Sequence, residues 1–553
     1  MHTTITRVRL PAGDGLSGLH DLVLKAGRIV EITSTADSRT PAGNVFDAGG
    51  RICLPGLVDS HSHAAAAVFD PAIQLALLRQ GVTTIIVGQD GIGFAPSDER
   101  SLAWTQSYFA GIDGKTERIK AGDIAHWLAS YDNATSINVA ALVPHGSLRY
   151  LVTGAAQRPS TKPEVLQMAQ YLAAAFDQGA VGFSTGLEYV PAAWADHLEL
   201  TELLRVTAAS KRVHTSHMRG YEEKAPKAVA ELVELAQQSG VSTSITHYHG
   251  DAQTLGGLLD EAAAAGVPMT FDSYPYLRGC SLLAMVSLPT WLPLADPRAT
   301  LDLLANDASA QNRLASHLAA LTDLWPRTTL AWADGTDPAT GAALSWTVGL
   351  TVPQIASQLQ TTEADAVLRL LVGTELRAAC VFAQPPTNSA ASVSQLADRP
   401  EHMAGSDGIY VPFSANSPLS NAGKGVSGSQ TENSAAVVAP SRSHPRGWGA
   451  MTRWLTTKVL SGDWSWADAV EHLAARAVRR YGLGERGRLA VGAVADLILV
   501  DEATLQDAAT YEQPRSLATG IADIWVAGVQ VLADGELTGE NSGMGLRWER
   551  NTR

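Results

Sequence analysis

The sequence predicts an α/β protein: a (β/α)8 barrel of the TIM type with a small β-sandwich domain that both termini build. Apolar runs typical of strands alternate with helical stretches through the middle of the chain, and histidines or aspartates follow several of these runs. Both ends of the chain are rich in strand-like segments, whereas the middle is not. Alternating β and α segments indicate a parallel sheet, and eight strands over about 350 residues indicate a barrel with insertions.

Eight candidate strands and the helices between them make up the predicted barrel, residues 55–479. The strands are expected to end at His61, Gly88, His145, Thr185, His217, His247, Asp272 and Asp407. Helical periodicity separates most of them and is clearest over residues 162–178, 223–239 and 254–265. The last interval is too long for one crossover, so we expect a largely helical insertion at about residues 281–400, clearest over 301–321 and 362–371.

The two ends of the chain are predicted to meet in one small domain, residues 1–54 together with 480–553. Residues 21–32 are typical of a β-hairpin with its turn at Lys25-Ala26-Gly27, and residues 495–501 and 524–532 have similar patterns. Residues 414–443 differ, because they are rich in Ser, Asn, Gly and Ala and have no clean period. We expect a long mobile loop there, either a solvated connector or a cover for a site.

The composition favours a cytoplasmic protein, and the partner that we expect from the motifs below is a small-molecule substrate. The 553 residues carry a net charge of -14, which argues against a surface that binds nucleic acid. The three cysteines, Cys53, Cys280 and Cys380, are scattered and imply no disulfide framework, as expected in a reducing compartment. The sequence shows no signal-peptide pattern and no apolar run that could cross a bilayer, so we expect no membrane partner. A homo-oligomer stays open.

His61-Ser62-His63 is the first candidate metal-binding motif. Side chains at i and i+2 of an extended chain point to the same side, so two neutral imidazoles leaving a buried strand can bind one divalent ion. The motif is weak alone, but further polar residues stand at other predicted strand ends: Asp90, His145, His217, His247 and Asp407. Because the C-terminal ends of barrel strands share one rim, these residues predict a metal site there.

Four histidines and two carboxylates can hold two ions if one anionic ligand bridges them. In the expected arrangement one metal takes His61, His63 and Asp407, the other takes His217 and His247, and Asp90 is the bridge. We expect one or two Zn²⁺ ions and leave another divalent metal open. A metal-bound hydroxide would attack a carbonyl, while Asp407 would take the proton of the water and hand it to the leaving nitrogen.

Several segments, spread over nearly the whole chain, resemble one known family. They include residues 54–63 around the two histidines, 81–88, 144–149, 182–189, 217–219, 272–276, Gly405-Ser406-Asp407-Gly408, His444-Pro445-Arg446 and 484–501. Together they are similar to the amidohydrolase superfamily, and within it to the N-acyl-D-amino-acid deacylase (D-aminoacylase) group. The resemblance implies a metal-bearing barrel, a β-sandwich from both termini and hydrolysis of the amide of an acylated amino acid. Position by position, it implies the same six metal ligands.

The chain departs from the pattern of this group at two places. Gly88-Gln89-Asp90-Gly91 stands where the group usually has Gly-Asn-Cys-Gly, so a carboxylate replaces a thiolate and a single-metal site stays open. Thr246-His247-Tyr248-His249 stands where the group usually has Ser-His-His-Lys, whose lysine is implied to help hold the substrate carboxylate. His249 is a weaker and pH-dependent cation, so we expect a different choice of substrate.

Five side chains are candidates for contact with the substrate. Arg219, Tyr189 and Tyr276 could orient a carboxylate or a carbonyl, and the alternatives are a surface ion pair for Arg219 and core packing for the tyrosines. His249 would face the substrate carboxylate. His145 would either bond the substrate or hold its own loop.

The favoured function is metal-dependent hydrolysis of the amide bond of an N-acyl amino acid, with the D configuration implied by the resemblance. One alternative is an amidohydrolase that acts on a cyclic amide, a lactone, a carbamate or a specialised peptide-like substrate. Another is a non-catalytic scaffold on the same fold. A candidate ligand at every expected position, including Asp407, argues against the scaffold.

Overall fold

The computed structural model describes residues 2–37, 43–410 and 442–549, and a barrel of parallel strands forms its centre. Eight strands follow each other in the order β16-β12-β11-β10-β9-β8-β7-β6, and each ladder between neighbours is parallel. Their bounds are β6 (Leu57–Asp59), β7 (Val82–Val87), β8 (Asn138–Pro144), β9 (Gly182–Gly186), β10 (Val213–His217), β11 (Ser242–Ile245), β12 (Thr270–Ser273) and β16 (His402–Ala404); β21 (Gly545–Leu546) pairs with β8. The predicted barrel is confirmed.

Backbone hydrogen bonds close the barrel along a seam between its first and last strands, β6 and β16. They run from Ser60 N to Ala404 O (3.1 Å), from Asp407 N to His61 O (2.8 Å) and from His63 N to Gly408 O (3.0 Å). An isolated bridge between Ser62 and Gly408 stands there instead of a regular ladder. The seam therefore places the first predicted metal-binding motif beside the last one.

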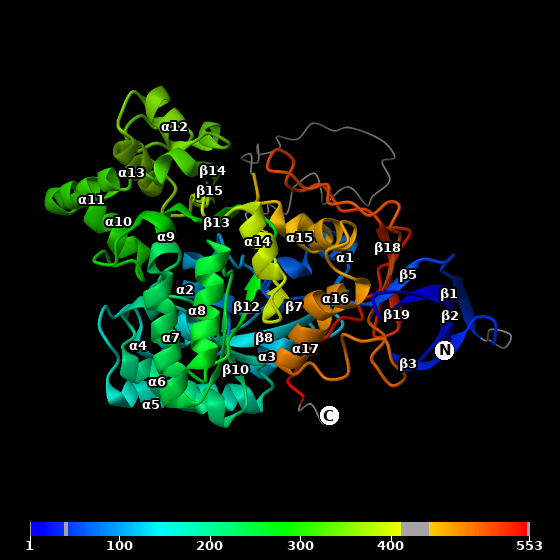
Figure 1. Ribbon diagram of the computed structural model, residues 1–553. Helices are drawn as coiled ribbons and strands as arrows, with labels where there is room; N and C mark the ends of the chain where they lie inside the picture. Colours follow the sequence, from blue (N-terminus) through cyan, green and yellow to red (C-terminus); the bar gives the residue numbers. More distant parts are fainter. Residues whose placement is uncertain (1, 38–42, 411–441, 550–553) are drawn as a thin grey trace.

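Helices surround the barrel (Figure 1). Their bounds are α1 (Pro71–Arg79), α2 (Glu99–Tyr108), α3 (Ile124–Ala129), α4 (His145–Thr153), α5 (Lys162–Asp177), α6 (His197–Ala209), α7 (Ala225–Ser239), α8 (Ala252–Ala264), α14 (Ala390–Ala397), α15 (Arg446–Trp454), α16 (Trp466–Val470) and α17 (Arg476–Tyr481). In α5, Thr161 and Glu164 form a capping box, and Val165, Met168 and Leu172 form a buried stripe. The predicted helices 162–178, 223–239 and 254–265 correspond to α5, α7 and α8.

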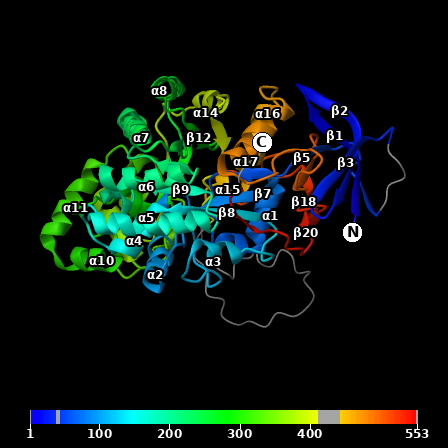
Figure 2. The same ribbon diagram turned by 90° about the horizontal axis from the view of Figure 1, so that it is seen from below.

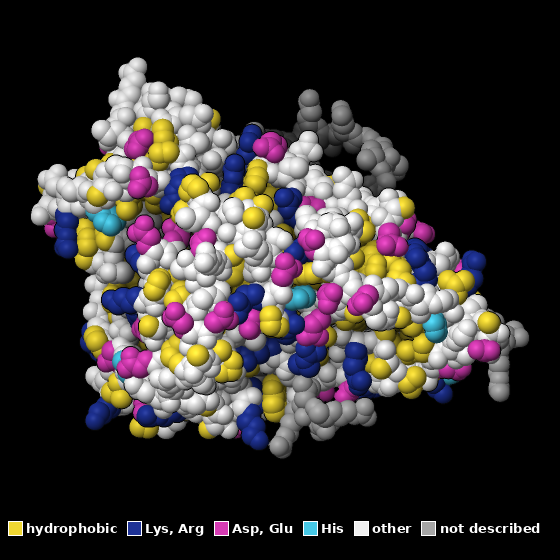
Figure 3. Space-filling model, viewed as in Figure 1, with side chains coloured by type: hydrophobic (Ala, Val, Ile, Leu, Met, Phe, Trp, Pro, Cys, Tyr) yellow, Lys and Arg dark blue, Asp and Glu magenta, His cyan; other side chains and the backbone are white. Residues whose placement is uncertain are grey.

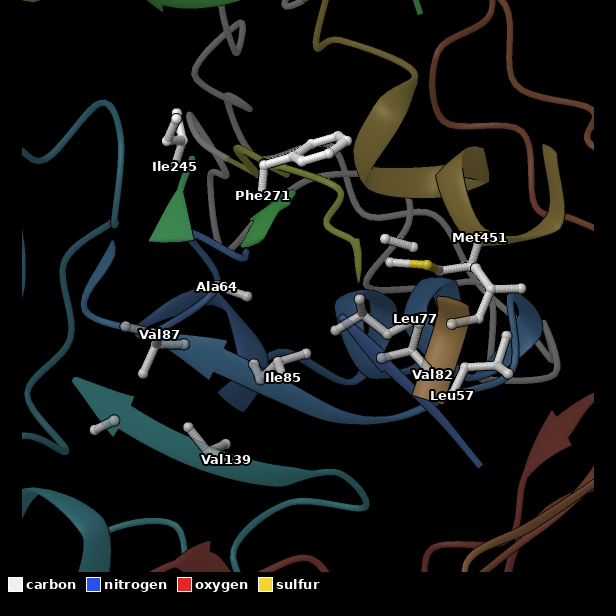
Figure 4. Close-up of a cluster of buried hydrophobic side chains, with 14 of the residues drawn as sticks. Leu57, Ala64, Leu77, Val82, Ile85, Val87, Val139, Ile245, Phe271 and Met451 are labelled. Carbon is white, nitrogen blue, oxygen red and sulfur yellow. The ribbon is translucent and has the colours of Figure 1, made fainter. Parts of the chain in front are cut away.

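The main core lies between the strands and the outer helices. Figure 4 shows Leu57 of β6 and Val82 of β7 close to Leu77 of α1 and Met451 of α15. Each such side chain contributes about 1.5–3 kcal/mol when it is fully buried. A separate cluster fills the inside of the barrel, where Tyr481 of α17 packs among strand residues. The barrel is therefore a packed core, and its chemistry is confined to the rim.

Both termini build a second nine-stranded sheet at one end of the molecule (Figures 1 and 2). Its strands are β1 (His2–Ala12), β2 (Gly15–Lys25), β3 (Arg28–Ser34), β4 (Asn44–Asp47), β5 (Ile52–Pro55), β17 (Leu497–Val500), β18 (Ile521–Val526), β19 (Val529–Ala533) and β20 (Glu536–Leu537). Antiparallel pairing of β5 with β17 joins the two ends of the chain. The predicted hairpin turns at Ala26 and Gly27, with φ of 49° and 76°, as a tight turn requires. A β domain from both termini is confirmed.

The insertion between β12 and β16 is largely helical, as predicted. Its helices are α9 (Leu283–Ser287), α10 (Pro297–Asn306), α11 (Ala308–Ala320), α12 (Val352–Leu359) and α13 (Glu363–Gly373). The expected helix over 301–321 is divided, because Asp307 ends α10 and its carboxylate accepts from the first N–H groups of α11. The sequence did not indicate the antiparallel sheet β13-β15-β14, formed by β13 (Arg278–Leu282), β15 (Ala379–Ala383) and β14 (Thr328–Trp332).

The surface mixes charges of both signs. On the face shown in Figure 3, acidic and basic side chains are interspersed. Within the described ranges, we find no helix with the length and apolar character needed to span a membrane. The loop predicted over 414–443 lies outside the described residues, apart from Arg442 and Ser443.

Candidate metal centre

Six polar side chains meet at the C-terminal rim of the barrel. They are His61 and His63 after β6, Asp90 in the 3-10 turn η2 (Gln89–Gly91) after β7, His217 at the end of β10, His247 after β11 and Asp407 after β16. Each is buried, with at most 7% of its surface exposed. They form two groups with ligand atoms within 4.8 Å of one another: His61, His63, Asp90 and Asp407; and Asp90, His217 and His247. The structure thus brings together all six predicted ligands.

Asp90 Oδ2 faces a ring nitrogen of each of the four histidines. The distances are 3.5 Å to His61 Nε2, 3.6 Å to His63 Nε2, 3.8 Å to His217 Nδ1 and 3.4 Å to His247 Nε2. Asp407 Oδ1 lies 3.7 Å from His61 Nε2 and 3.4 Å from His63 Nε2. Ligand atoms about 2.1 Å from one tetrahedral ion stand about 3.4 Å apart, so this spacing suits a divalent ion in each group.

His61 tests whether a metal ion fits these residues. Its Nε2 is buried and has no hydrogen-bond partner, although it faces Asp90 and Asp407. Leaving a buried nitrogen unpaired is costly, whereas a neutral imidazole nitrogen is a good ligand for Zn²⁺. Imidazoles and carboxylates together suit Zn²⁺ and similar divalent ions. The residues present therefore fit a divalent metal.

In three of these imidazoles, the ring nitrogen that does not face Asp90 is paired with another carboxylate. The pairs are His61 Nδ1 with Asp272 Oδ1 (3.2 Å), His63 Nδ1 with Asp113 Oδ1 (2.8 Å) and His217 Nε2 with Glu188 Oε2 (3.1 Å). Such partners fix the orientation of a ligating imidazole and raise its basicity. The sequence alone indicated none of these three roles. Asp272 and Glu188 lie in segments that match the family pattern, whereas Asp113 carries no such signal.

Left-handed backbone turns three of the candidate ligands over the rim. Asp90, His247 and Asp407 have φ of 55°, 35° and 48°, a region that residues with a Cβ seldom adopt. At Asp90 the turn also needs a close neighbour without a side chain, because a Cβ at Gly186 would lie 2.0 Å from Asp90 O. Strained backbone of this kind concentrates at functional sites.

The charges in the site support one another. Burial raises the pKa of the Asp90 carboxyl, but the surrounding histidines outweigh it and hold that pKa well below its usual range. For His61, burial lowers the pKa, but Asp272 and Asp90 outweigh it and raise the pKa to about 10. The pKa of His217 rises to about 9 against the effect of burial, because Asp90 and Glu188 are close. Without metal, these two imidazoles are protonated at neutral pH.

Arg446 completes the site on the side of Asp407. It is fully buried, and its Nη1 lies 2.7 Å from Asp407 Oδ2. Burial raises the pKa of Asp407, but the Arg446 guanidinium and the nearby histidines outweigh burial and hold that pKa well below its usual range. The carboxylate is therefore ionised. No role for Arg446 was predicted, although His444-Pro445-Arg446 is among the segments that match the family pattern.

Two of the predicted substrate residues lie beside the metal-ligand groups. The Tyr189 hydroxyl is 3.1 Å from His217 Nδ1. His249 stacks on Tyr221, with ring centroids 5.3 Å apart, and its Nδ1 lies 2.6 Å from His247 O. Burial and the nearby His247 lower the pKa of His249 to about 4. His249 is therefore a neutral imidazole at pH 7 and supplies no positive charge.

The other three predicted substrate residues make their contacts elsewhere. Arg219 pairs with Glu231 (3.1 Å) and donates to backbone carbonyls, including Ala193 O (3.0 Å). The Tyr276 hydroxyl donates to Asp507 (3.1 Å), and Tyr276 lines a cavity of about 420 Å³ whose walls include none of the six candidate ligands. His145 Nε2 lies 2.8 Å from Glu199 Oε1, and Arg149 pairs with the same carboxylate. These bonds give each of the three a structural partner.

Comparison with known proteins points to one family. The model of the amidohydrolase family matches residues 44–415. N-acyl-D-glutamate deacylase of Alcaligenes xylosoxydans xylosoxydans is 30% identical over 533 residues, which cover 94% of this chain and 91% of that protein. D-aminoacylase of the same organism is 26% identical over 541 residues, 95% of this chain and 92% of that protein.

A solved structure is similar over almost the full length. It is the crystal structure of N-acyl-D-glutamate deacylase from Bordetella bronchiseptica, complexed with zinc and with a phosphonate inhibitor that mimics the tetrahedral intermediate of the reaction. The TM-score is 0.75 at 27% identity, and the match covers 99% of each chain.

Proposed function

The chain belongs to the amidohydrolase family, and from this premise we propose that it hydrolyses the amide bond of an N-acylated amino acid. The observation that carries the proposal is the pair of ligand groups that share Asp90. We assign metal binding to the six side chains of these groups. The D configuration is supported by relatives that are deacylases of N-acyl-D-amino acids and resemble the chain over nearly its whole length.

Bound at these groups, one or two divalent ions such as Zn²⁺ would act as a Lewis acid and lower the pKa of a coordinated water. Asp407 accepts the proton of the attacking water and passes it to the leaving nitrogen, because it is ionised and its Oδ1 faces His61 and His63. Arg446 holds the other oxygen of Asp407, which keeps the carboxylate in one orientation. The Tyr189 hydroxyl lies 3.1 Å from His217 Nδ1, beside the second ligand group, where it would orient the carbonyl of the substrate.

Recognition of the substrate carboxylate differs from the family pattern. The lysine of that pattern is replaced by His249, which is neutral at pH 7. A neutral imidazole offers a hydrogen bond but no charge, so we expect His249 to attract a substrate carboxylate less strongly than a lysine would at the same position. The proposed substrate is a small molecule. The proposed compartment is a reducing cytoplasm, and the three free cysteines support that compartment.

The test is a substrate panel with the metal-loaded protein. We expect N-acetyl-D-amino acids to release free amino acid, their L counterparts to react more slowly, and a chelator to stop the reaction until metal is restored. Asp407→Asn is the matched control, because it keeps the shape of the side chain. If cyclic amides, lactones or carbamates were hydrolysed and no N-acyl amino acid were, the proposal would be wrong. The protein would then be an amidohydrolase of those compounds.

A further inference from the structure

Asp59 is a fully buried carboxylate that the proposed reaction does not use. It is the last residue of β6, and none of its surface is exposed. Both of its oxygens are bonded at the seam of the barrel. Oδ1 accepts from Ser406 N (2.7 Å) and from His61 N (3.3 Å), and Oδ2 accepts from the Ser406 hydroxyl (2.5 Å). Because a buried carboxylate is costly without such donors, these bonds hold the loop after β16 against the first strand.

Ser406 extends this constraint to both sides of Asp407. Its Oγ accepts a bond from Gly408 N (3.0 Å), so one side chain spans the residue between them. Asp407 itself has φ of 48°, in the left-handed region that residues other than glycine seldom adopt. The bond from Asp407 N to His61 O (2.8 Å) ties the same residue to the other side of the seam.

We propose that Asp59 and Ser406 form a clamp that closes the seam and fixes Asp407 against His61 and His63. The two residues are positioning residues, since they act through Asp407. The proposal rests on the proposed function, which assigns proton transfer and metal binding to that side chain. Asp407 Oδ1 stands 3.4 Å and 3.7 Å from the two imidazoles. A displacement of about 1 Å at such a distance lowers a reaction rate by about 100-fold.

Ser406→Ala is the direct test, and Ser60→Ala is its matched control. The Ser60 hydroxyl is equally buried and donates across the same seam, to Ala404 O (2.8 Å), but its bond ends three residues before Asp407. Both changes remove one buried hydroxyl, so a general weakening of the seam affects them alike. The measurements are kcat and KM with an N-acyl amino acid, and zinc affinity by competition with a chelator.

We expect Ser406→Ala to lower kcat by about 10- to 100-fold with KM changed less than about threefold, and to weaken zinc affinity about tenfold. Ser60→Ala should change each quantity less than about twofold. In an Asp407→Asn background, Ser406→Ala should cause no further loss of zinc affinity, because its effect passes through Asp407. Equal effects of Ser406→Ala and Ser60→Ala on kcat and zinc affinity would overturn the clamp. A full further loss of zinc affinity on adding Ser406→Ala to Asp407→Asn would also overturn it.

Asp59→Asn decides the matter if Ser406→Ala does not fold. The amide keeps the acceptor for Ser406 N but reverses the bond to the Ser406 hydroxyl, so kcat should fall about fivefold more than in Ser60→Ala. A variant no worse than Ser60→Ala would overturn the clamp. Zinc affinity needs no substrate, so failure of the unmodified protein to turn over any N-acyl amino acid would count against the proposed function alone.

Discussion

Metal binding to this site should release protons, and the number released should differ between the two ligand groups. Burial lowers the pKa of His61 and of His63, but neighbouring carboxylates outweigh it, raising His61 to about 10 and His63 well above its usual range. In the second group His217 has its pKa raised to about 9. A metal ion binds only the neutral imidazole, so it must displace these protons.

The size of the effect follows from these values. Below pH 9, each displaced proton makes the affinity rise about tenfold per pH unit, which is about 1.4 kcal/mol. The first group should release at least two protons, from His61 and His63, so its affinity should rise about 100-fold per unit. The second group should release at least one, from His217, and its affinity should rise about tenfold per unit.

Isothermal titration calorimetry of the metal-free protein with Zn²⁺, in two buffers of different ionisation enthalpy at pH 7 and pH 8, counts these protons. Asp113→Asn should reduce the count for the first group, because Asp113 Oδ1 lies 2.8 Å from His63 Nδ1. Glu188→Gln should reduce it for the second group, because Glu188 Oε2 lies 3.1 Å from His217 Nε2. Fewer than one proton per metal, or an affinity that does not change between these pH values, would refute the reasoning.

The same pKa values govern the stability of the metal-free protein. The pKa of His61 and of His217 is higher in the folded protein than the ordinary value of 6.5. Their protonation therefore contributes its full stabilisation below about pH 6.5, and this contribution is lost progressively as the pH rises from there through about 9 to 10. The melting temperature of the metal-free protein should fall over this range of pH, and bound metal should remove the fall.

Substitutions at three residues test the other assignments. Asp407→Asn should lower kcat by about 10²- to 10⁴-fold while much of the metal stays bound, and a near-normal rate would contradict the proton transfer. Asp90→Ala should release at least one metal equivalent by elemental analysis, whereas Asp90→Cys should keep the metal and favour Zn²⁺ over Mn²⁺. Unchanged metal content in Asp90→Ala would leave Asp90 as a turn residue only. His249→Lys should improve turnover of carboxylate-bearing substrates, and an unchanged relative KM would place His249 away from that carboxylate.

The candidate ligands could be predicted because their signals are local. Each stands at or just after an apolar run, and the barrel topology brings the ends of parallel strands to one rim. His217 and His247 follow neighbouring strands β10 and β11, so their meeting needs no further information. The hairpin at Ala26 and Gly27 was predictable for the same reason, because turn residues are recognised within a few positions of the chain.

The contacts of the other polar residues depend on distant partners and could not be predicted. The bond of His63 reaches Asp113, 50 residues away, and the bond of Tyr276 reaches Asp507, 231 residues away. Nothing in the sequence shows whether a polar side chain is engaged by the fold or left free for a substrate. Arg219 illustrates this, because Glu231 and backbone carbonyls occupy the groups that were expected to face a ligand.

Asp90 and Asp407 each precede a glycine, which is typical of a turn, and they show that a turn residue can also be a candidate metal ligand. Each could be read as a turn residue or as a metal ligand, and the structure gives both the left-handed backbone of a turn and a side chain in the site. A strand that continued in extended conformation would carry these side chains past the rim. The turn is what directs the carboxylate inward, at a cost of about 1–3 kcal/mol for each strained residue. Asparagine or glycine would ease the backbone at these positions, but neither could supply the carboxylate, so the requirement of the site outweighs the local preference of the chain.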